Sequence, residues 1–165
     1  MRKDAADKIL DQWSAERPEL DTAALGIVIR IMSLNRTFGR EATAALEPLD
    51  LELWEYDVLS ALRRQGSPFA LPATRLARES ELSSGAMTNR IDRLEDRSLV
   101  RREADPGDRR GVRVVLTRDG KRIIDKAIRY RLDAASRHLR SLSAKERTQL
   151  ADLLRGVVID VNRDI

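Results

Sequence analysis

Apolar and polar residues follow the 3.6-residue period of amphipathic helices over most of the chain. Pro18 and Pro48 end the first two periodic segments, and Gly66 with the proline that follows ends the third. Asp50 is expected to cap the third helix, and Ser83 or Ser84 the fifth. Ser143 and Glu146 have the spacing of a capping box for the last helix. Helices are predicted over residues 4–16, 21–46, 51–65, 73–82, 84–98, 117–142 and from 143 onward.

After Leu99 the hydrophobic period changes from that of a helix to that of a strand. The stretch "VRREADPGDRRGVRVVLT" contains two extended arms joined by a turn-rich loop over residues 105–111. In the second arm Val112, Val114 and Leu116 alternate with their neighbours, as in a half-buried strand. The expected fold is therefore mainly α, with a small two-stranded β-hairpin.

The helix that precedes the hairpin has two unlike faces. Met87, Ile91 and Leu94 form one apolar stripe, whereas small polar residues crowd the first turns of the opposite face. Two short helices followed by a hairpin wing is the order of a winged helix-turn-helix, whose second helix enters the DNA major groove. The alternative is a solvated helix face and a charged surface turn. The expected DNA-binding residues are Ser84, Gly85, Thr88, Asn89, Arg93, Asp108, Arg109, Arg110 and Arg113.

The charge distribution supports a polyanionic partner. The formal net charge is +4, and residues 84–122 hold 11 basic against 7 acidic residues, while the rest of the chain holds 20 of each. The whole basic excess therefore lies in this one stretch, which contains the helix and the wing expected to meet DNA.

Several classes of chemistry are disfavoured by composition. The chain has no cysteine and one histidine, so thiol chemistry, histidine metal sites and a Ser/His/Asp triad are not expected. No phosphate-cradling loop or nucleophile motif is present. We expect no cofactor, no enzymatic activity and no membrane segment, and a cytoplasmic, nucleoid-associated protein.

The stretch from "LARESELSSGAMTNRIDRLEDRSLVRR" to "EADPGDRRGVRVVLTRDGK" resembles the DNA-binding core of the MarR family of bacterial transcription regulators. The resemblance covers about residues 51–122. It implies a homodimer on a pseudo-palindromic operator, acting as a repressor of a neighbouring gene. It assigns residues 1–48 to dimerisation and the ligand site, 49–118 to the DNA-binding lobe and 119–165 to dimerisation. The long apolar stripe of the last helix also favours a partner helix, although it could instead pack within one chain.

Four residues raise the question of a ligand. Asp57 and Arg64 are seven positions apart, about 10.5 Å along one helix face, which is too far for an ordinary helix ion pair. Ala61 between them leaves room, and Arg90 lies at the edge of the apolar stripe of its helix. With Trp13, these spacings resemble the urate-responsive (PecS-like) subfamily of MarR regulators.

That resemblance implies a role for each of the four residues. Trp13 would stack on an anionic purine and Arg64 would bind its anionic edge. Asp57 would move away from the anion, and its link with Arg90 would carry the signal to the DNA-binding helix. Three alternatives remain: a phenolic or other aromatic acid or an antibiotic as ligand, a winged-helix DNA binder without ligand control, and purely structural roles for all four residues.

Overall fold

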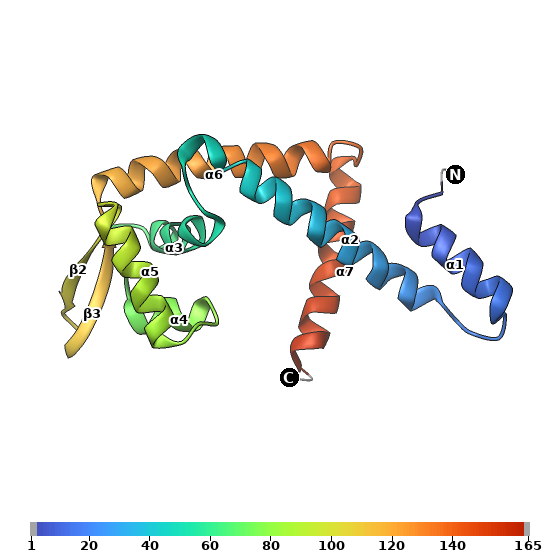
Figure 1. Ribbon diagram of the computed structural model, residues 1–165, viewed down its shortest axis with the longest axis horizontal. Coiled ribbons are helices and arrows are strands. Elements are labelled where there is room, and N and C mark those ends of the chain that lie inside the picture. The colour runs from blue at the N-terminus through green and yellow to red at the C-terminus, as the bar shows by residue number, and fades with distance from the viewer. Residues whose placement is uncertain (1–2, 164–165) are drawn as a thin grey trace. The chain divides into compact units, whose positions relative to one another are not determined.

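The computed structural model describes residues 3–163, with the side chains of Arg109 and Arg110 outside the described part. The chain forms two compact units, one ending at Ala44 and one beginning at Ala45 (Figure 1). The first unit contains α1 (Ala5–Glu16) and α2 (Ala23–Ala44). The second contains, in order, η1 (Glu47–Leu49), α3 (Leu53–Arg64), β1 (Ala70–Pro72), α4 (Ala73–Glu79), α5 (Ser84–Asp96), β2 (Val100–Asp105), β3 (Asp108–Leu116), α6 (Arg118–His138) and α7 (Ala144–Arg163).

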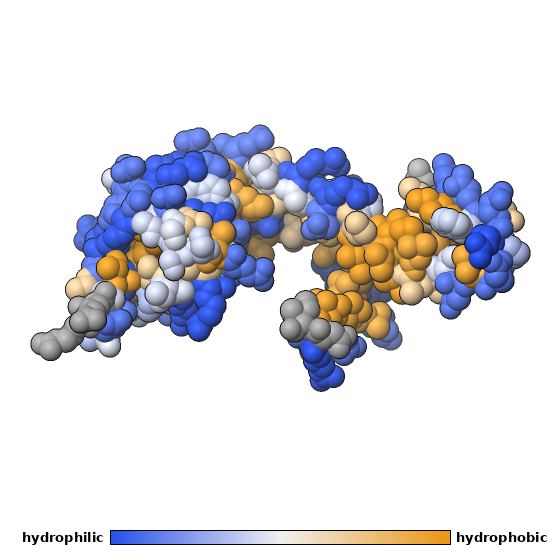
Figure 2. Space-filling view, turned by 60° about the horizontal axis from the view of Figure 1, so that its bottom comes forward, coloured by the Kyte–Doolittle hydropathy of each residue, from blue (hydrophilic) through white to orange (hydrophobic). Residues whose placement is uncertain are grey.

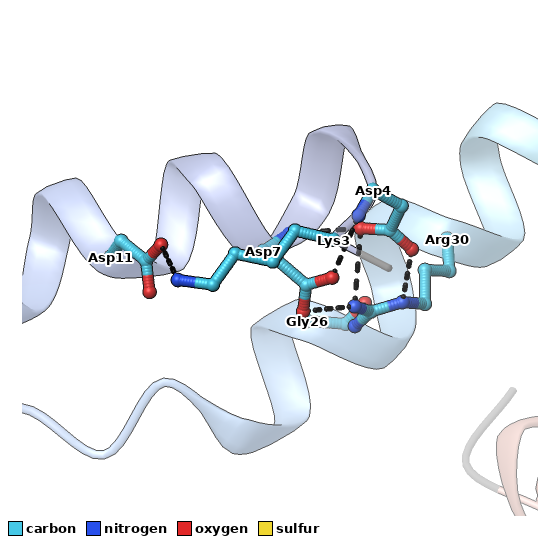
Figure 3. A network of polar contacts seen from close by, with 6 residues as sticks. All are labelled: Lys3, Asp4, Asp7, Asp11, Gly26 and Arg30. Carbon is cyan, nitrogen blue, oxygen red and sulfur yellow. Dashed lines mark hydrogen bonds and ion pairs between the residues drawn. The ribbon is translucent and has the colours of Figure 1, made fainter. Parts of the chain in front are cut away.

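In the first unit, charged side chains hold α1 against α2. Asp4 caps α1 in a reciprocal capping box with Asp7. Arg30 of α2 reaches both carboxylates, with its Nε 2.9 Å from Asp4 and one Nη 2.7 Å from Asp7 (Figure 3). Gly26 lets Leu10 approach, because a Cβ there would lie 2.8 Å from a leucine methyl carbon. The two helices therefore pack closely at the end where α1 begins.

The second unit has one continuous hydrophobic core. Leucine, isoleucine, valine, methionine and alanine side chains supply its buried members. The largest buried apolar side chains are Leu46, Leu59, Leu62, Leu76, Met87, Ile91, Leu94, Ile124, Val58, Val100 and Val114. The stripe of Met87, Ile91 and Leu94 predicted from the sequence is buried, which confirms the inward face of α5.

The sheet has three antiparallel strands in the order β1-β3-β2, so the prediction of a two-stranded hairpin was incomplete. Ala70 pairs with Val115, and Val100 pairs with Leu116. β1 has only three residues, too few for an alternating pattern to be visible in the sequence. The predicted loop over residues 105–111 was too long, because β3 already begins at Asp108.

The helix termini confirm some predicted caps and correct one. Ser83 caps α5 by accepting a hydrogen bond from the Ala86 amide, as predicted. Asp50 does not cap α3, because it lies in the left-handed region at the end of η1. Glu52 takes that place and exchanges hydrogen bonds with Glu55 in a capping box.

The starts of α4 and α7 differ in their capping. The predicted box of Ser143 and Glu146 forms at the start of α7. Pro72 precedes α4 without a side-chain cap. Short α4 is therefore stabilised by packing of Leu76 and Ala77 against the core rather than by its own terminus.

Both α2 and α7 carry exposed apolar side chains, which form part of the orange areas in Figure 2. α7 has no buried residue. Its exposed apolar side chains are Leu150, Leu153, Leu154, Val157, Val158, Ile159 and Val161. Within residues 3–163, no helix is long and apolar enough to cross a membrane.

Gly120 yields a stability prediction. A Cβ at this position would lie 1.9 Å from the Leu99 carbonyl oxygen, which belongs to the backbone and has little room to move. We expect Gly120→Ala to lower the free energy of unfolding by roughly 1–3 kcal/mol, measured by urea denaturation. Gly85→Ala is the control, because a Cβ there meets nothing within 4 Å. Equal stability of the two variants would contradict the close approach of α6 to the Leu99 backbone, just before β2.

Candidate functional site

The exposed face of α5 carries the polar residues predicted to meet DNA. Ser84, Gly85, Thr88 and Asn89 are all exposed, on the side opposite the buried stripe. The Thr88 hydroxyl donates to the Ser84 carbonyl at 2.8 Å, which orients that side chain along the helix. A Cβ at Gly85 would meet no atom within 4 Å, so packing does not require a glycine at this position. The face is rich in small side chains with hydrogen-bonding groups, as a helix that reads the major groove requires.

Arg93 lies farther along α5 and is held by residues of α3. Its guanidinium forms an ion pair with Glu52 and lies over the Trp54 ring, with Cζ 4.7 Å from the ring centroid. The side chain is nevertheless well exposed, so it is at the surface while tied to α3. Its predicted contact with a DNA phosphate would compete with these two partners.

The wing places its charged residues in pairs. Arg113 donates to Glu103 on the neighbouring strand at 3.0 Å through Nε, and Arg101 also bonds Glu103. These two arginines lower the pKa of the Glu103 carboxyl. Asp108 is exposed at the start of β3, where its side chain lies against Gly111. The predicted contacts of Arg109 and Arg110 concern side chains outside the described residues.

A hollow of about 270 Å³ opens between α3, the end of α4 and α5. It is lined by charged and small residues from these three elements. The lining residues are Asp57, Ala61, Arg64, Glu79, Ser80 and Arg90. The structure thus brings together three residues singled out from the sequence as a ligand site, and Ala61 leaves the space between two of them.

The charges in this hollow are only partly compensated. Glu79 is paired with Arg75 at 2.7 Å, and Arg64 donates to the Ser60 hydroxyl at 3.0 Å. Among the described hydrogen bonds and ion pairs, none joins Asp57 to Arg90. Arg90 instead lies over Trp54, with Cζ 5.3 Å from the ring centroid. Asp57 and Arg90 therefore interact by Coulombic attraction at a distance, without a direct hydrogen bond or ion pair.

Asp57 has an unusual electrostatic environment. The surrounding protein takes water away from its carboxylate, which raises the pKa above its ordinary value, although the residue as a whole is exposed. Arg131, Arg90 and Arg64 oppose that shift by attraction. The effect of desolvation is larger than that of the three arginines, so the Asp57 carboxyl is protonated more readily here than in water.

Arg131 is a residue that sequence reasoning missed. It lies on α6, with its guanidinium carbon 5.4 Å from the Tyr56 ring, and its Nε is buried without a hydrogen-bond partner in the described structure. It also exerts the strongest attraction on the Asp57 carboxylate. No spacing in the sequence links it to Asp57, because the two meet only through the packing of α6 on α3.

Trp13, the fourth predicted ligand residue, lies on α1 in the first unit, where 45% of its surface is exposed. An exposed tryptophan on a helix is free to contact a partner molecule or a planar ligand. Its part in a ligand site stays a prediction.

The described residues hold no cluster of three or more acidic, histidine or cysteine side chains suited to a metal ion. What they do hold is a helix-turn-helix with a wing, a polar exposed face on the second helix, and arginines around it. These features define a winged helix-turn-helix DNA-binding protein.

Comparison with known proteins indicates which family of winged helix-turn-helix proteins this chain resembles. A family model described as "MarR family" matches residues 49–111. The HTH-type transcriptional regulator PecS of Dickeya dadantii is 30% identical over 146 residues, which is 88% of this chain and 88% of PecS. The multiple antibiotic resistance protein MarR of Salmonella typhimurium is 30% identical over 78% of this chain and 88% of its own length.

Solved structures agree. A mutant MarR from Escherichia coli complexed with operator DNA is 27% identical, with a TM-score of 0.68 over 88% of this chain and 96% of that one. AbsC, a MarR family regulator from Streptomyces coelicolor, has the same fold, with a TM-score of 0.76 at 24% identity over 87% of this chain and 97% of its own. The chain belongs to the MarR family of DNA-binding transcription regulators, which is not a family of enzymes.

The raised pKa of Asp57 leads to a prediction about pH. A carboxyl whose pKa is raised on folding contributes stability below its unfolded value, near 3.8, and loses that contribution as the pH rises through the folded value. Asp57→Asn should therefore have a higher Tm than the wild type at pH 7, and the difference should shrink as the pH falls toward 4.

The control is Asp152→Asn, which removes the same charge from an exposed ion pair with Arg155. It should give no gain at pH 7. A Tm of Asp57→Asn at or below that of the wild type at pH 7 would show that attraction to the three arginines outweighs desolvation.

Proposed function

We propose that this regulator is a homodimeric repressor released from its operator by urate or a related small organic anion bound in the hollow between α3 and α5. One observation carries the proposal: Asp57, Arg64 and Arg90, chosen from their spacing in the sequence, line the same hollow. Arg64 and Arg90 supply positive charge from two different helices. The spacing resembles that of the urate-responsive subfamily, which favours urate among organic anions.

The hollow also contains a charge that an anion must displace. A carboxylate a few ångströms from a bound anion is repelled, so Asp57 must move or take up a proton when the ligand binds. Its raised pKa makes protonation less costly. Either response removes a negative charge that attracts Arg90, which lies on the DNA-binding helix. Ligand binding would thereby change the position of α5 or of its side chains.

Trp13 is proposed to complete the site by stacking on the planar ligand. Stacking uses an exposed aromatic face, and the exposed ring of Trp13 provides one.

The homodimer is proposed from the exposed apolar helices. α7 presents seven large apolar side chains to the surface and buries none, and α2 adds more. Soluble domains rarely leave such stripes uncovered, so a second copy of the chain is the natural partner. We accordingly assign residues 1–48 and 119–165 to dimerisation and 49–118 to DNA binding.

The dimer can be tested by the stoichiometry of DNA binding. When a labelled operator duplex is titrated to saturation with the protein, two chains should bind each duplex. A stoichiometry of one chain per duplex would contradict the dimer.

The DNA contacts of the wing can be tested by salt dependence. Replacing both Arg109 and Arg110 by Ala should weaken binding to any duplex and flatten the slope of log K against log salt, by about 0.9 for each lost phosphate contact. The matched control removes two exposed arginines of α6, Arg122 and Arg129, and should leave the slope nearly unchanged. An unchanged slope in the wing variant would count against the predicted contacts.

The ligand site can be tested by fluorescence anisotropy on a labelled duplex from upstream of this chain's own gene. Urate should weaken binding of the wild type by about 5- to 150-fold, the usual range of allosteric coupling. Arg64→Ala should bind the duplex normally and lose the response to urate. Arg63→Ala is the matched control, because this neighbouring arginine pairs with Asp125 at 2.7 Å and does not line the hollow.

Three outcomes would change the proposal. Loss of DNA binding in a folded Arg64→Ala protein would show that the role given to Arg64 is wrong. Wild-type binding indifferent to urate but weakened by salicylate would move the ligand class to phenolic acids. Indifference to both would favour a regulator without control through this hollow.

A further inference from the structure

Trp54 on α3 lies under two arginines of the DNA-binding helix. The guanidinium carbons of Arg90 and Arg93 are 5.3 Å and 4.7 Å from the centroid of its ring. The two arginines are three positions apart on α5 and are therefore neighbours on its surface. The Trp54 ring therefore makes cation–π contacts with both guanidinium groups, which repel each other.

The two arginines face different parts of the molecule. Arg90 lines the hollow with Asp57 and Arg64, whereas Arg93 lies outside the lining of that hollow and is exposed. Trp54 itself is partly buried against the core and so offers a fixed platform. The ring is therefore shared between the hollow and the exposed surface of α5.

Glu52 adds a second hold on Arg93. Its Oε2 accepts a hydrogen bond from the Trp54 indole Nε1 at 2.7 Å, and its Oε1 accepts one from Arg93. The hydrogen bonds from Trp54 and Arg93 lower the pKa of the Glu52 carboxyl, because both stabilise its charged form. Arg93 is consequently held by a carboxylate and an aromatic face that both belong to the start of α3.

We propose that Trp54 is a positioning residue that couples occupation of the hollow to the availability of Arg93 for DNA. An anion in the hollow draws Arg90 toward itself and off the ring. The ring and Glu52 are then left to Arg93 alone, without repulsion from the second cation, and they hold it more firmly. Arg93 is thereby taken from the DNA phosphate that it would otherwise contact. The inference rests on the proposed anion site in this hollow.

The coupling can be measured without any ligand by a double-mutant cycle on DNA affinity. Arg90→Gln removes the cation that competes for the ring and so imitates its withdrawal by an anion. It should weaken binding to the labelled upstream duplex at least about threefold in the wild-type background. In an Arg93→Ala background the same change should matter by less than about twofold, because no held arginine remains.

The cycle is repeated with Trp54→Phe, which keeps an aromatic ring for the core but removes the indole N–H that positions Glu52. The effect of Arg90→Gln should fall below about twofold there as well. Arg122→Gln is the control for loss of one positive charge, since this exposed arginine pairs only with Asp119 among the described ion pairs. Thermal melts of every variant establish that each is folded before its affinity is compared.

Two results would overturn the coupling. If Arg90→Gln weakens binding equally with and without Arg93, Arg90 acts on DNA independently. If the Trp54→Phe protein retains the full effect, the Trp54 indole and its hydrogen bond to Glu52 are not the link. The proposal is supported if the effects of Arg90→Gln and Arg93→Ala on DNA affinity are non-additive in the wild-type background and become additive in the Trp54→Phe protein.

Urate separates this inference from the proposed function. Equal weakening of DNA binding by urate in wild type and Trp54→Phe would overturn the coupling and leave the anion site standing. A non-additive cycle in a protein indifferent to urate would support the coupling and contradict urate as the ligand.

Discussion

The geometry of the DNA-binding lobe depends on a buried ion pair between Glu55 and Arg97. The Glu55 side chain is 1% exposed, and both of its carboxylate oxygens accept from one Arg97 nitrogen, at 2.9 Å and 2.7 Å. A second nitrogen of Arg97 donates to the Asp50 carbonyl at 2.6 Å. Removing Arg97, whose side chain is 33% exposed, would leave the buried Glu55 charge without its partner. Such a loss usually costs about 3–5 kcal/mol. The pair therefore joins the end of α5 to the start of α3.

That constraint explains why the hollow and the shared tryptophan can exist. With the end of α5 held at Glu55, Arg93 meets Glu52, and Arg90, nearly one turn earlier, reaches Trp54 and the hollow. In the proposed mechanism, this contact would pass a small change near Asp57 along α5, because closely packed elements move together. The three carboxylates on this side of α3 therefore differ in their partners. Glu55 is ion-paired with Arg97 and Glu52 with Arg93, whereas Asp57 is only attracted by nearby arginines.

The candidate site shows how far sequence spacing can lead. Asp57 and Arg64 share a helix, so their common face follows from the helical repeat. Arg90 could be placed at the edge of the apolar stripe because it is next to Ile91, a member of that stripe, and the structure buries Ile91 as expected. Arg131 and the double use of Trp54 could not be foreseen. They depend on how α6 and α5 lie against α3, and no local period records the distance between residues far apart in the chain.

Local chemistry in the sequence was enough to determine most elements of this protein. The apolar stripe of α5, the cap at Ser83 and the capping box at Ser143 depend on near neighbours, so they were predicted correctly. The predicted alternation around Val114 was wrong: Val112 is exposed and Val115 is buried, because β3 is the central strand of the sheet. Only the tertiary structure decided the strand β1, the cap at Glu52 and the grouping of charges around Asp57. A three-residue strand is stabilised by pairing with β3, and a buried carboxylate by an arginine 42 positions away. Interactions across such separations exist only once the core has brought the helices together.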